Sequence, residues 1–284
     1  MLGTYSWPRV KWSLPKATLP ISRSDLVLDV GSGSNPHPAA DILLDRYANT
    51  RHRHATPLVT DRPTILGDAC RMPFKDKAFD FVVAFHVLEH IADPAAFLSE
   101  LQRVARAGYI ETPNILFERL VPYDVHVLEV AAIGNELIIN KKASSRPDPT
   151  LNELRLIEKC GLWRRHFYSH PELFHVRYFW RDEIRFRIIN PEQECNWFVT
   201  ESFLPDEASP QANDTNPVFD LRRWGLGALR RWSVLVKRTH LELLGLLACP
   251  ACRRELSVGG EDLICQGCST RYPVRGTVID FLSQ

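Results

Sequence analysis

Four cysteines near the C-terminus have a spacing typical of metal ligands. They form two CxxC pairs, Cys249 with Cys252 and Cys265 with Cys268, and twelve residues separate the pairs. Four thiolates in this arrangement bind Zn²⁺ tetrahedrally and leave no coordination position for a substrate, so we predict a structural zinc site. The last 36 residues are too few to be stabilised by their own core, and metal binding would supply that stability. Disulfides or free thiols are the alternative, and disulfides are rare in the cytosol.

Closer to the N-terminus, glycines and acidic residues follow short apolar runs. The segment "VLDVGSG" contains Asp29, Gly31 and Gly33, and Asp45 and Asp68 end the next two apolar runs. In an open parallel sheet, ligands bind beyond the carboxyl ends of the strands, where these residues would lie. The two glycines let the backbone approach a ligand closely. Asp45 is then placed to accept hydrogen bonds from a ribose diol, and Asp68 to reach an adenine edge.

The same loop lacks two features of a dinucleotide site. Pro36 stands where a third glycine is expected, and only ten residues, 31–40, separate the first two apolar runs. A helix long enough to cradle a pyrophosphate does not fit in this connection. The pattern therefore predicts a nucleoside-like ligand without phosphates. A tight turn that binds nothing is the alternative for an isolated GxG.

Four residues are candidates for a general base. They are His86 and His90 in "FHVLEH", Glu111 in "IETPN", and His126. His86 directly follows the fourth predicted strand, where this kind of sheet opens toward a second substrate, so we rank it first. We expect His90 to cap or pack the following turn. A purely structural hydrogen-bonding role is the alternative for each of them.

These residues need a scaffold, and the apolar runs predict a parallel sheet. We predict strands over residues 26–30, 42–45, 64–68, 80–85 and 108–111. Their nearly continuous apolar character is typical of strands that are covered on both faces. The segment "HVLEVAAIGNELIIN" predicts an antiparallel hairpin that turns at Gly134 and Asn135. The predicted class is α/β, a Rossmann-like, mostly parallel open sheet with antiparallel edge strands, a long helix and a small C-terminal zinc ribbon.

The clearest helix signal is "ADPAAFLSELQRVARAG". Asp93 suits the N-cap, Pro94 suits the first helical position, and Gly108 is predicted to end the helix. Arg103 and Arg106 lie near its negative end. The expected buried face consists of Phe97, Leu98, Leu101 and Val104.

Two further segments combine aromatic and basic residues. Residues 163–187 include eight aromatic residues and six arginines. They predict either a clamp for a base or a phosphate-bearing glycan, or an ordinary β element with isoleucines inside and arginines in water. A long amphipathic helix is predicted over residues 219–247, and it would either contact a membrane surface or polyanion or pack on the rest of the chain. Residues 141–149 and 204–217 are predicted linkers.

In order along the chain, "VLDVGSG", Asp45, "GDACRMPFKDKAFDFVVAFHVLEHIADP" and "ELQRVARAGYIETPN" resemble the class I S-adenosyl-L-methionine (SAM)-dependent methyltransferases. The resemblance covers residues 25–115. It implies that the loop from Gly31 to Gly33 lies beside the methionine part of the cofactor, that Asp45 binds the ribose, and that the adenine faces Asp68. The implied cofactor-contacting residues are Asp29, Gly31, Gly33, Asp45, Asp68, Ala69 and His86.

The chain departs from that family at two points. The helix after the first strand is cut short, and the usual glycine-rich turn before the fifth strand reads "ARAGYIETPN". The first departure leaves the methionine end of the cofactor less enclosed, so another segment is expected to cover it.

The cysteine pairs together with "CSTRYPVRGTVIDFL" resemble the small zinc-ribbon subunit that activates several RNA and translation-factor methyltransferases. The resemblance covers residues 246–283 and is weaker at "TVIDFL". In that family the subunit docks on the catalytic domain, adds a strand and covers apolar surface. The resemblance therefore implies that the ribbon docks on its own catalytic domain and stabilises the cofactor pocket in cis.

The two resemblances together imply a SAM-dependent methyltransferase with a structural zinc, and His86, Glu111 and His126 are its catalytic candidates. The formal net charge of +1 does not favour RNA, so we expect a small-molecule or saccharide acceptor. An RNA or translation-protein acceptor is the first alternative, and a non-catalytic methyltransferase-like binding module is the second.

The first residues contain charges and prolines in place of the apolar segment of a signal peptide, and no apolar run approaches the ~18 residues of a membrane span. We therefore expect a cytoplasmic protein, with peripheral membrane contact through the basic helix as an option. The predicted organisation is an N-terminal extension (1–24), a SAM-binding domain (25–145), an acceptor-side insertion with linkers (146–217), the basic helix (218–247) and the zinc ribbon (248–284).

Overall fold

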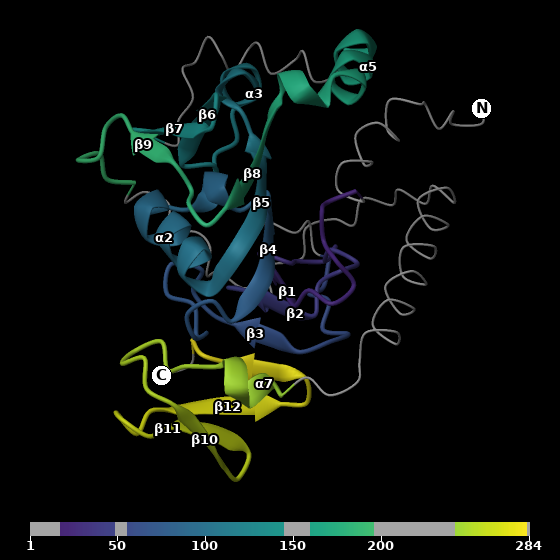
Figure 1. The fold of residues 1–284 in the computed structure, drawn as a ribbon. Helices are drawn as coiled ribbons and strands as arrows, with labels where there is room; N and C mark the ends of the chain where they lie inside the picture. Colours follow the sequence, from purple (N-terminus) through teal and green to yellow (C-terminus); the bar gives the residue numbers. More distant parts are fainter. Residues whose placement is uncertain (1–17, 49–55, 145–159, 196–241, 283–284) are drawn as a thin grey trace.

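The computed structural model describes residues 18–48, 56–144, 160–195 and 242–282, and a ten-stranded sheet runs through it (Figure 1). The strands lie in the order β10-β11-β12-β13-β3-β2-β1-β4-β5-β8. Their bounds are β1 (Val27–Val30), β2 (Ile42–Asp45), β3 (Thr64–Leu66), β4 (Phe79–Phe85), β5 (Ala105–Pro113), β8 (His175–Arg181), β10 (Leu256–Gly259), β11 (Asp262–Cys265), β12 (Arg271–Arg275) and β13 (Val278–Asp280).

The central strands form the predicted parallel sheet. Strands β3, β2, β1, β4 and β5 pair in parallel, and β8 pairs with β5 in the antiparallel direction at one edge. Strands β1 and β2 are buried along their whole length, because apolar clusters cover both faces of the sheet. The α/β class and all five predicted strands are confirmed.

The connection from β1 to β2 contains no helix. Residues 31–41 form turns and bends, and β2 then begins at Ile42. This confirms the prediction that the first crossover is too short for a full helix.

Helix α2 (Pro94–Val104) packs on one face of the sheet (Figure 1). The carboxylate of Asp93 caps it by accepting a hydrogen bond from the amide of Ala96 at 3.0 Å. The four residues of the predicted apolar face are buried. The other helical segments are short: η2 (Leu88–His90), α3 (Ile115–Leu120), α5 (Gly161–Ser169), η4 (Pro171–Leu173) and α7 (Leu243–Leu246).

The predicted end of α2 at Gly108 is wrong. Strand β5 begins at Ala105, directly after the helix, and its first pairing joins Ala105 to Phe79 of β4. Pairing with a neighbouring strand therefore ends the helix before the glycine is reached. Arg106 consequently lies in a strand rather than in the last helical turn.

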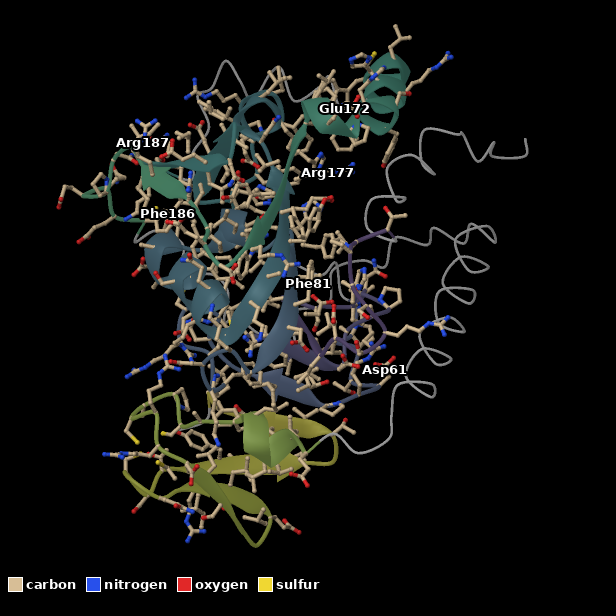
Figure 2. The ribbon with its side chains drawn as sticks, viewed as in Figure 1. Asp61, Phe81, Glu172, Arg177, Phe186 and Arg187 are labelled. Atoms are coloured by element: carbon tan, nitrogen blue, oxygen red, sulfur yellow. The ribbon has the colours of Figure 1, made fainter. Side chains whose placement is uncertain are left out.

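A second sheet contains β6 (Leu128–Ile133), β7 (Glu136–Lys141) and β9 (Phe186–Ile188). Strands β6 and β7 form the predicted hairpin, with Gly134 at a φ of +60° in its turn. Strand β9 pairs in parallel with β7, and Arg187 on it is exposed while Ile184 just before it is buried (Figure 2). Ile184 and Arg187 thus lie as the ordinary β alternative predicted, and the clamp alternative stays a prediction.

The aromatic residues of the same segment pack on one another. Phe174 is buried together with Phe117 of α3, and Phe167 of α5 lies 5.3 Å from Phe117 between ring centroids. Trp163 contacts Phe174 edge-on, with the ring centroids 5.0 Å apart. These rings form a small core between α3, α5 and the start of β8.

The C-terminal ribbon extends the sheet. Strand β13 pairs in parallel with β3, and the amide of Phe281 donates to the carbonyl of Leu66 at 2.8 Å. Leu247 forms an isolated bridge with Phe74. The ribbon residues that belong to the main apolar core are Leu247, Cys249, Leu256, Leu263, Cys265, Tyr272, Ile279 and Phe281. The ribbon therefore docks on the parallel sheet of its own chain and adds a strand to it.

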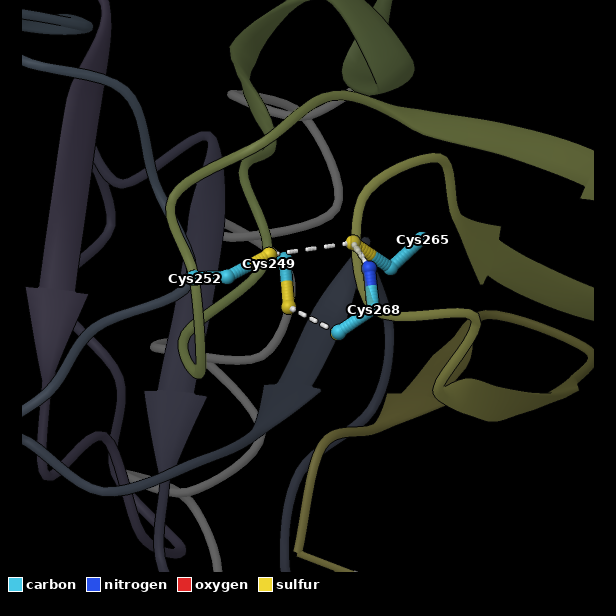
Figure 3. A group of neighbouring side chains, drawn as sticks. All are labelled: Cys249, Cys252, Cys265 and Cys268. Atoms are coloured by element: carbon cyan, nitrogen blue, oxygen red, sulfur yellow. Dashed lines mark hydrogen bonds between the residues drawn. The ribbon is translucent and has the colours of Figure 1, made fainter.

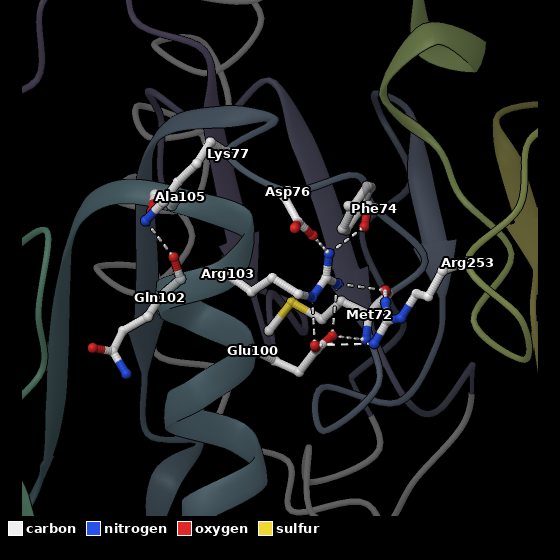
Figure 4. A network of polar contacts seen from close by, with 9 residues as sticks. All are labelled: Met72, Phe74, Asp76, Lys77, Glu100, Gln102, Arg103, Ala105 and Arg253. Carbon is white, nitrogen blue, oxygen red and sulfur yellow. Dashed lines mark hydrogen bonds and ion pairs between the residues drawn. The ribbon is translucent and has the colours of Figure 1, made fainter.

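A buried carboxylate joins the two parts (Figure 4). Glu100 on α2 accepts hydrogen bonds from the amide of Met72 (2.6 Å) and from the guanidinium of Arg103 (2.5 and 2.8 Å). Arg253 of the ribbon donates to the same carboxylate at 3.0 Å and to the Met72 carbonyl at 2.8 Å. Orientation of the ribbon thus depends on polar contacts as well as on apolar packing.

We expect Gly108→Ala to destabilise the sheet. A Cβ at this position would lie 2.7 Å from the backbone oxygen of Val82 and 2.8 Å from the Trp180 ring. Overpacking of this kind costs about 1–3 kcal/mol of unfolding free energy. Gly161→Ala is the matched control, because a Cβ there meets nothing within 4 Å. Thermal unfolding of the two variants checks the difference, and equal stability would contradict it.

Of the helix predicted over 219–247, only residues 242–247 are described, and they include the short helix α7. Most of both predicted linkers also lies outside the described residues. Among the described residues, no helix has the length and apolarity needed to cross a membrane.

Candidate functional site

The loop after β1 turns at two glycines. Gly31 has a φ of +70° and Gly33 a φ of +52°, a conformation that residues with a side chain rarely adopt. A Cβ on Gly31 would lie only 2.1 Å from a methyl carbon of Val87. Backbone conformation and close packing both explain why glycine stands at position 31.

Asp45 ends β2 and holds this loop. Its Oδ2 accepts a hydrogen bond from the amide of Gly33 and its Oδ1 one from the amide of Tyr47, both at 2.9 Å. Asp45 thus fixes backbone amides through both of its carboxylate oxygens.

Asp68 and Ala69 follow β3. Asp68 accepts a hydrogen bond from the amide of Cys70 at 2.8 Å and lies 3.3 Å from the guanidinium of Arg46. Burial and the charge of Asp68 raise the pKa of the Cys70 thiol to about 12, so this cysteine is a neutral neighbour of the site.

One cavity of about 200 Å³ lies beyond the carboxyl ends of β1 to β4. Six of the seven residues that the resemblance implied line it: Gly31, Gly33, Asp45, Asp68, Ala69 and His86. Asp29 does not line it, and its carboxylate instead accepts a hydrogen bond from the amide of His37 at 2.6 Å. The cavity is smaller than the roughly 300–1,000 Å³ typical of ligand pockets, so its enclosed volume suits part of a ligand such as a nucleoside.

Ser32 supplies a polar group at the same loop. Its hydroxyl is buried, and it has no hydrogen-bond partner among the described residues. Buried polar atoms are normally paired, and a hydroxyl of this kind suits a polar ligand bound at the loop. The loop, the acidic residues and this hydroxyl together fit an adenosine-type cofactor.

His86 lies directly after β4 and faces two carboxylates. Its Nδ1 is 3.3 Å from Oε1 of Glu89 and its Nε2 is 3.6 Å from Oε1 of Glu111. Its φ of +56° is unusual for a residue with a side chain, and its amide donates to the Glu111 carbonyl at 2.8 Å. An imidazole between two carboxylates can accept a proton, because both charges stabilise the imidazolium.

Glu89 is almost completely buried behind His86. Its Oε2 accepts a hydrogen bond from the hydroxyl of Thr112 at 2.8 Å. Burial alone would raise the pKa of Glu89, but the hydrogen bond and charge of His86, with two further histidines, lower it to about 2. Glu89 is therefore a fixed negative charge near neutral pH.

Glu111 is completely buried on β5. The antiparallel register places it opposite Arg177 of β8, whose Nε lies 3.2 Å from Oε2 (Figure 2). The hydroxyl of Tyr109 donates to the same carboxylate at 2.9 Å. Burial and the neighbouring charge of Glu111 raise the pKa of Tyr109. The Glu111 carboxylate thus contacts His86, Tyr109 and Arg177.

His126 pairs with a different carboxylate from those beside His86. Its Nδ1 pairs with Glu118, whose other carboxylate oxygen accepts from Nζ of Lys142 at 2.7 Å. Its ring meets the ring of His90 edge-on at 4.7 Å between centroids. His90 lines the cavity, and its Nδ1 lies 3.0 Å from the carbonyl of Val125, 35 residues along the chain. Its expected packing on the following turn stays a prediction.

Sequence reasoning missed three buried or half-buried charges of the site. Glu89 lies within "FHVLEH", three residues after His86, and that spacing was the available signal. Glu118 and Arg177 had no such signal, because their partners come from other elements.

The four predicted metal ligands do come together (Figure 3). The four Sγ atoms lie within 4.8 Å of one another, with 3.6 Å between Cys249 and Cys268 and 3.3 Å between Cys252 and Cys265. The amide of Gly267 donates to Sγ of Cys265 at 3.3 Å. A zinc ion with Zn–S bonds of about 2.3 Å keeps its sulfur ligands about 3.8 Å apart, so this donor set is compatible with zinc. The cysteines form no disulfide.

The four thiols differ in acidity when no cation is bound. Hydrogen bonds from Thr270 lower the pKa of Cys268 to about 6. A backbone hydrogen bond from Arg254 lowers the pKa of Cys252, but its interactions with Cys265 and the other cysteines raise it to about 12. Metal ligation requires all four as thiolates, and a cation between them would supply the positive charge that stabilises them.

Two family models match the chain. The model described as a methyltransferase domain matches residues 28–110, and the model described as a Trm112p-like protein matches residues 240–276. The chain therefore carries a class I SAM methyltransferase domain followed by a Trm112-like domain. The first match covers β1 to β5, and the second covers the cysteines and most of the ribbon.

The curated relatives are similar over short regions. Demethylmenaquinone methyltransferase of Mycobacterium sp. (strain KMS) is 33% identical over 103 residues, which are 32% of this chain and 42% of the relative. Ajmaline N-methyltransferase of Rauvolfia serpentina is 46% identical over 43 residues, 15% of either protein. The chain thus spans less than half the length of these relatives.

Some solved structures are similar to this chain at low sequence identity. A chain from the complex of the Haloferax volcanii Trm112 methyltransferase activator is 24% identical, with a TM-score of 0.29, over 37% of this chain and 51% of that one. The S-adenosylmethionine-dependent methyltransferase of Mesorhizobium loti is 13% identical, with a TM-score of 0.34, over 60% and 97%.

Proposed function

We propose that this chain is a SAM-dependent methyltransferase whose C-terminal ribbon stabilises the cofactor domain in cis. The observation that carries the proposal is the meeting of Gly31, Asp45, Asp68 and His86 in one cavity at the carboxyl ends of the parallel strands. The methyltransferase match over residues 28–110 includes the same elements.

The cofactor roles follow from these positions. Asp45 would accept hydrogen bonds from the ribose hydroxyls, and the adenine would lie against Asp68 and Ala69. The loop from Gly31 to Gly33 would contact the methionine part, and Asp29 would support that loop. When bound, the cofactor supplies an electrophilic methyl group on a sulfonium.

The contribution of the protein is positioning and proton uptake. His86 borders the cavity and would accept a proton from an acceptor hydroxyl or protonated amine. Glu89 and Glu111 would stabilise the resulting imidazolium, since both contact the ring. Positioning of the acceptor alone supplies on the order of 7–11 kcal/mol of barrier lowering. His126 does not line the cavity, so we propose His86 rather than His126 as the proton acceptor.

For the acceptor we favour a small molecule or a saccharide. The near-neutral charge of the chain gives no support for a polyanion, and the relatives named above include methyltransferases of small molecules. The Trm112-like match supports the alternative, an RNA or a translation protein. Zinc bound by the four cysteines would stabilise the fold of the ribbon. The proposal also includes the predicted domain limits and a cytoplasmic location.

The cofactor placement is tested with S-adenosylhomocysteine. Asp45→Ala removes charge-assisted hydrogen bonds worth about 1.5–3 kcal/mol, so affinity should fall roughly ten- to a hundredfold. Calorimetry measures the affinity, and thermal unfolding verifies the fold. Asp76→Ala is the control, because Asp76 is exposed and does not line the cavity. An unchanged affinity in folded Asp45→Ala protein would exclude this placement.

The acceptor class is tested with labelled methyl donor and fractionated cell extract. Label in the small-molecule or saccharide fraction supports our assignment, and label in RNA or protein supports the alternative. A folded protein that binds no S-adenosylhomocysteine would instead be a binding module.

A further inference from the structure

Three ligand-type side chains converge beside the cofactor cavity. Glu89 and His90 belong to η2, and His126 precedes β6. One ligand atom from each lies within 4.8 Å of the other two. Ligands bound at about 2.0–2.2 Å to one ion are roughly 3–4.3 Å apart, so small side-chain shifts would bring these atoms into one coordination sphere.

The histidines are oriented as metal ligands usually are. A ligating histidine generally bonds a carbonyl or carboxylate through its other ring nitrogen, which fixes the ring. Nδ1 of His90 lies 3.0 Å from the Val125 carbonyl, and Nδ1 of His126 pairs with Glu118. Because these bonds engage Nδ1 of each ring, Nε2 is the nitrogen that would bind the ion. The Thr112 hydroxyl fixes the Glu89 carboxylate in the same way at 2.8 Å.

The charges around the cluster also favour a cation. Glu89, Glu111 and Glu118 are buried carboxylates within this small region. Lys142 binds Glu118 at 2.7 Å, and Arg177 lies 3.2 Å from Glu111. Histidines stabilise the charge of Glu89, and Nδ1 of His86 lies 3.3 Å from its carboxylate. A divalent ion would stabilise Glu89 as Lys142 stabilises Glu118 and Arg177 stabilises Glu111.

We propose that Glu89, His90 and His126 bind a divalent first-row metal ion, in addition to the zinc of the ribbon. Two imidazoles and one carboxylate suit the ions from Mn²⁺ to Zn²⁺ and leave coordination positions open. Glu118 is then a positioning residue, because it acts through the His126 ring. The site is separate from the cysteines in sequence and in ligand chemistry.

This inference rests on the proposed function and narrows its acceptor. His90 lines the cavity that contains Asp45 and Gly31, so the ion would lie at the side where an acceptor enters. A metal ion lowers the pKa of a bound hydroxyl. The acceptor is therefore a hydroxyl compound, and His86 accepts its proton. The new C–O bond forms as the S–C bond of the cofactor breaks.

Manganese is the probe, because a four-thiolate site selects softer ions. Zinc-loaded full-length protein is titrated with Mn²⁺, and unbound Mn²⁺ is followed by electron paramagnetic resonance. Wild-type protein should bind one Mn²⁺ per chain. His126→Ala and Glu89→Gln should weaken binding at least tenfold, since even loss of a supporting partner costs about 10–100-fold.

His90→Gln protects the test against misfolding, because His90 is only partly buried and its loss should weaken Mn²⁺ binding equally. His170→Ala, a half-exposed histidine outside the cluster, is the matched control and should bind as wild type. Absence of saturable Mn²⁺ binding in wild-type protein, or unchanged binding in His90→Gln, overturns the inference.

Calorimetry with S-adenosylhomocysteine on the same samples separates the two proposals, because cofactor binding without Mn²⁺ binding removes only the metal site. Mn²⁺ binding without cofactor binding removes only the methyltransferase assignment.

Discussion

A chain that ends at Asn216, and so lacks the ribbon, is expected to be poorly soluble or to bind S-adenosylhomocysteine weakly. Without β13, strand β3 becomes an unpaired edge of only three residues. Such an edge offers unpaired N–H and C=O groups to other chains, and the apolar surface uncovered beside it promotes aggregation. Phe74 and Ile65 would also lose the apolar residues of the ribbon that share their core. Reburial of that surface contributes several kcal/mol at roughly 25 cal/mol per Å².

Residues 217–284 supplied as a separate chain should restore solubility and cofactor binding, because the contact is non-covalent. The same segment with Cys265→Ser is the matched control and should not restore them, since it cannot complete the metal site. A soluble truncated chain with full cofactor affinity would show that the ribbon is not an internal activator. The ribbon would then be assigned to acceptor recognition.

The second large effect concerns the zinc. We expect one cysteine-bound zinc per chain, and Cys252→Ser and Cys265→Ser should release it. Structural zinc contributes about 10–16 kcal/mol in zinc-finger peptides, so its loss should unfold the ribbon and lower the melting temperature of the whole protein. The effect should extend to the catalytic part, because both parts share one sheet.

Elemental analysis and thermal unfolding measure these effects. Cys160→Ser is the matched control, because Cys160 is exposed and lies outside the cluster. His126→Ala should retain the cysteine-bound zinc. If both cysteine variants keep their zinc, the four-thiolate assignment is wrong.

Local patterns predicted the central sheet well. Strands β1, β2 and β4 carry continuous apolar runs between turn residues, and burial on both faces requires such runs. The end of α2 was predicted wrongly, because Gly108 serves another purpose. It lies against Val82 and Trp180, where no side chain fits, so its role depends on strand pairing rather than on helix termination.

The meeting of six predicted residues in one cavity was also readable from the sequence, since they lie at or just after the ends of predicted strands. The contacts around Glu111 and His126 were not. Arg177 meets Glu111 only through the register of β5 and β8, and His126 meets Glu118 through a turn between α3 and β6. Such contacts depend on how distant elements pack, and no local spacing encodes them. The cysteines predicted the metal site, but nothing local predicted that "TVIDFL" would pair in parallel with β3.

The pairing of β13 with β3 has a consequence for biosynthesis. The hydroxyl of Thr277 bonds the carbonyl of Thr60, a contact that spans 217 positions of the chain. Ribosomes release a protein from its N-terminus, so β3 leaves the ribosome long before β13 has been synthesised. Contacts of such long range slow folding and leave a nascent chain open to misassembly. Defects in the ribbon should therefore also lower the amount of protein that accumulates in cells.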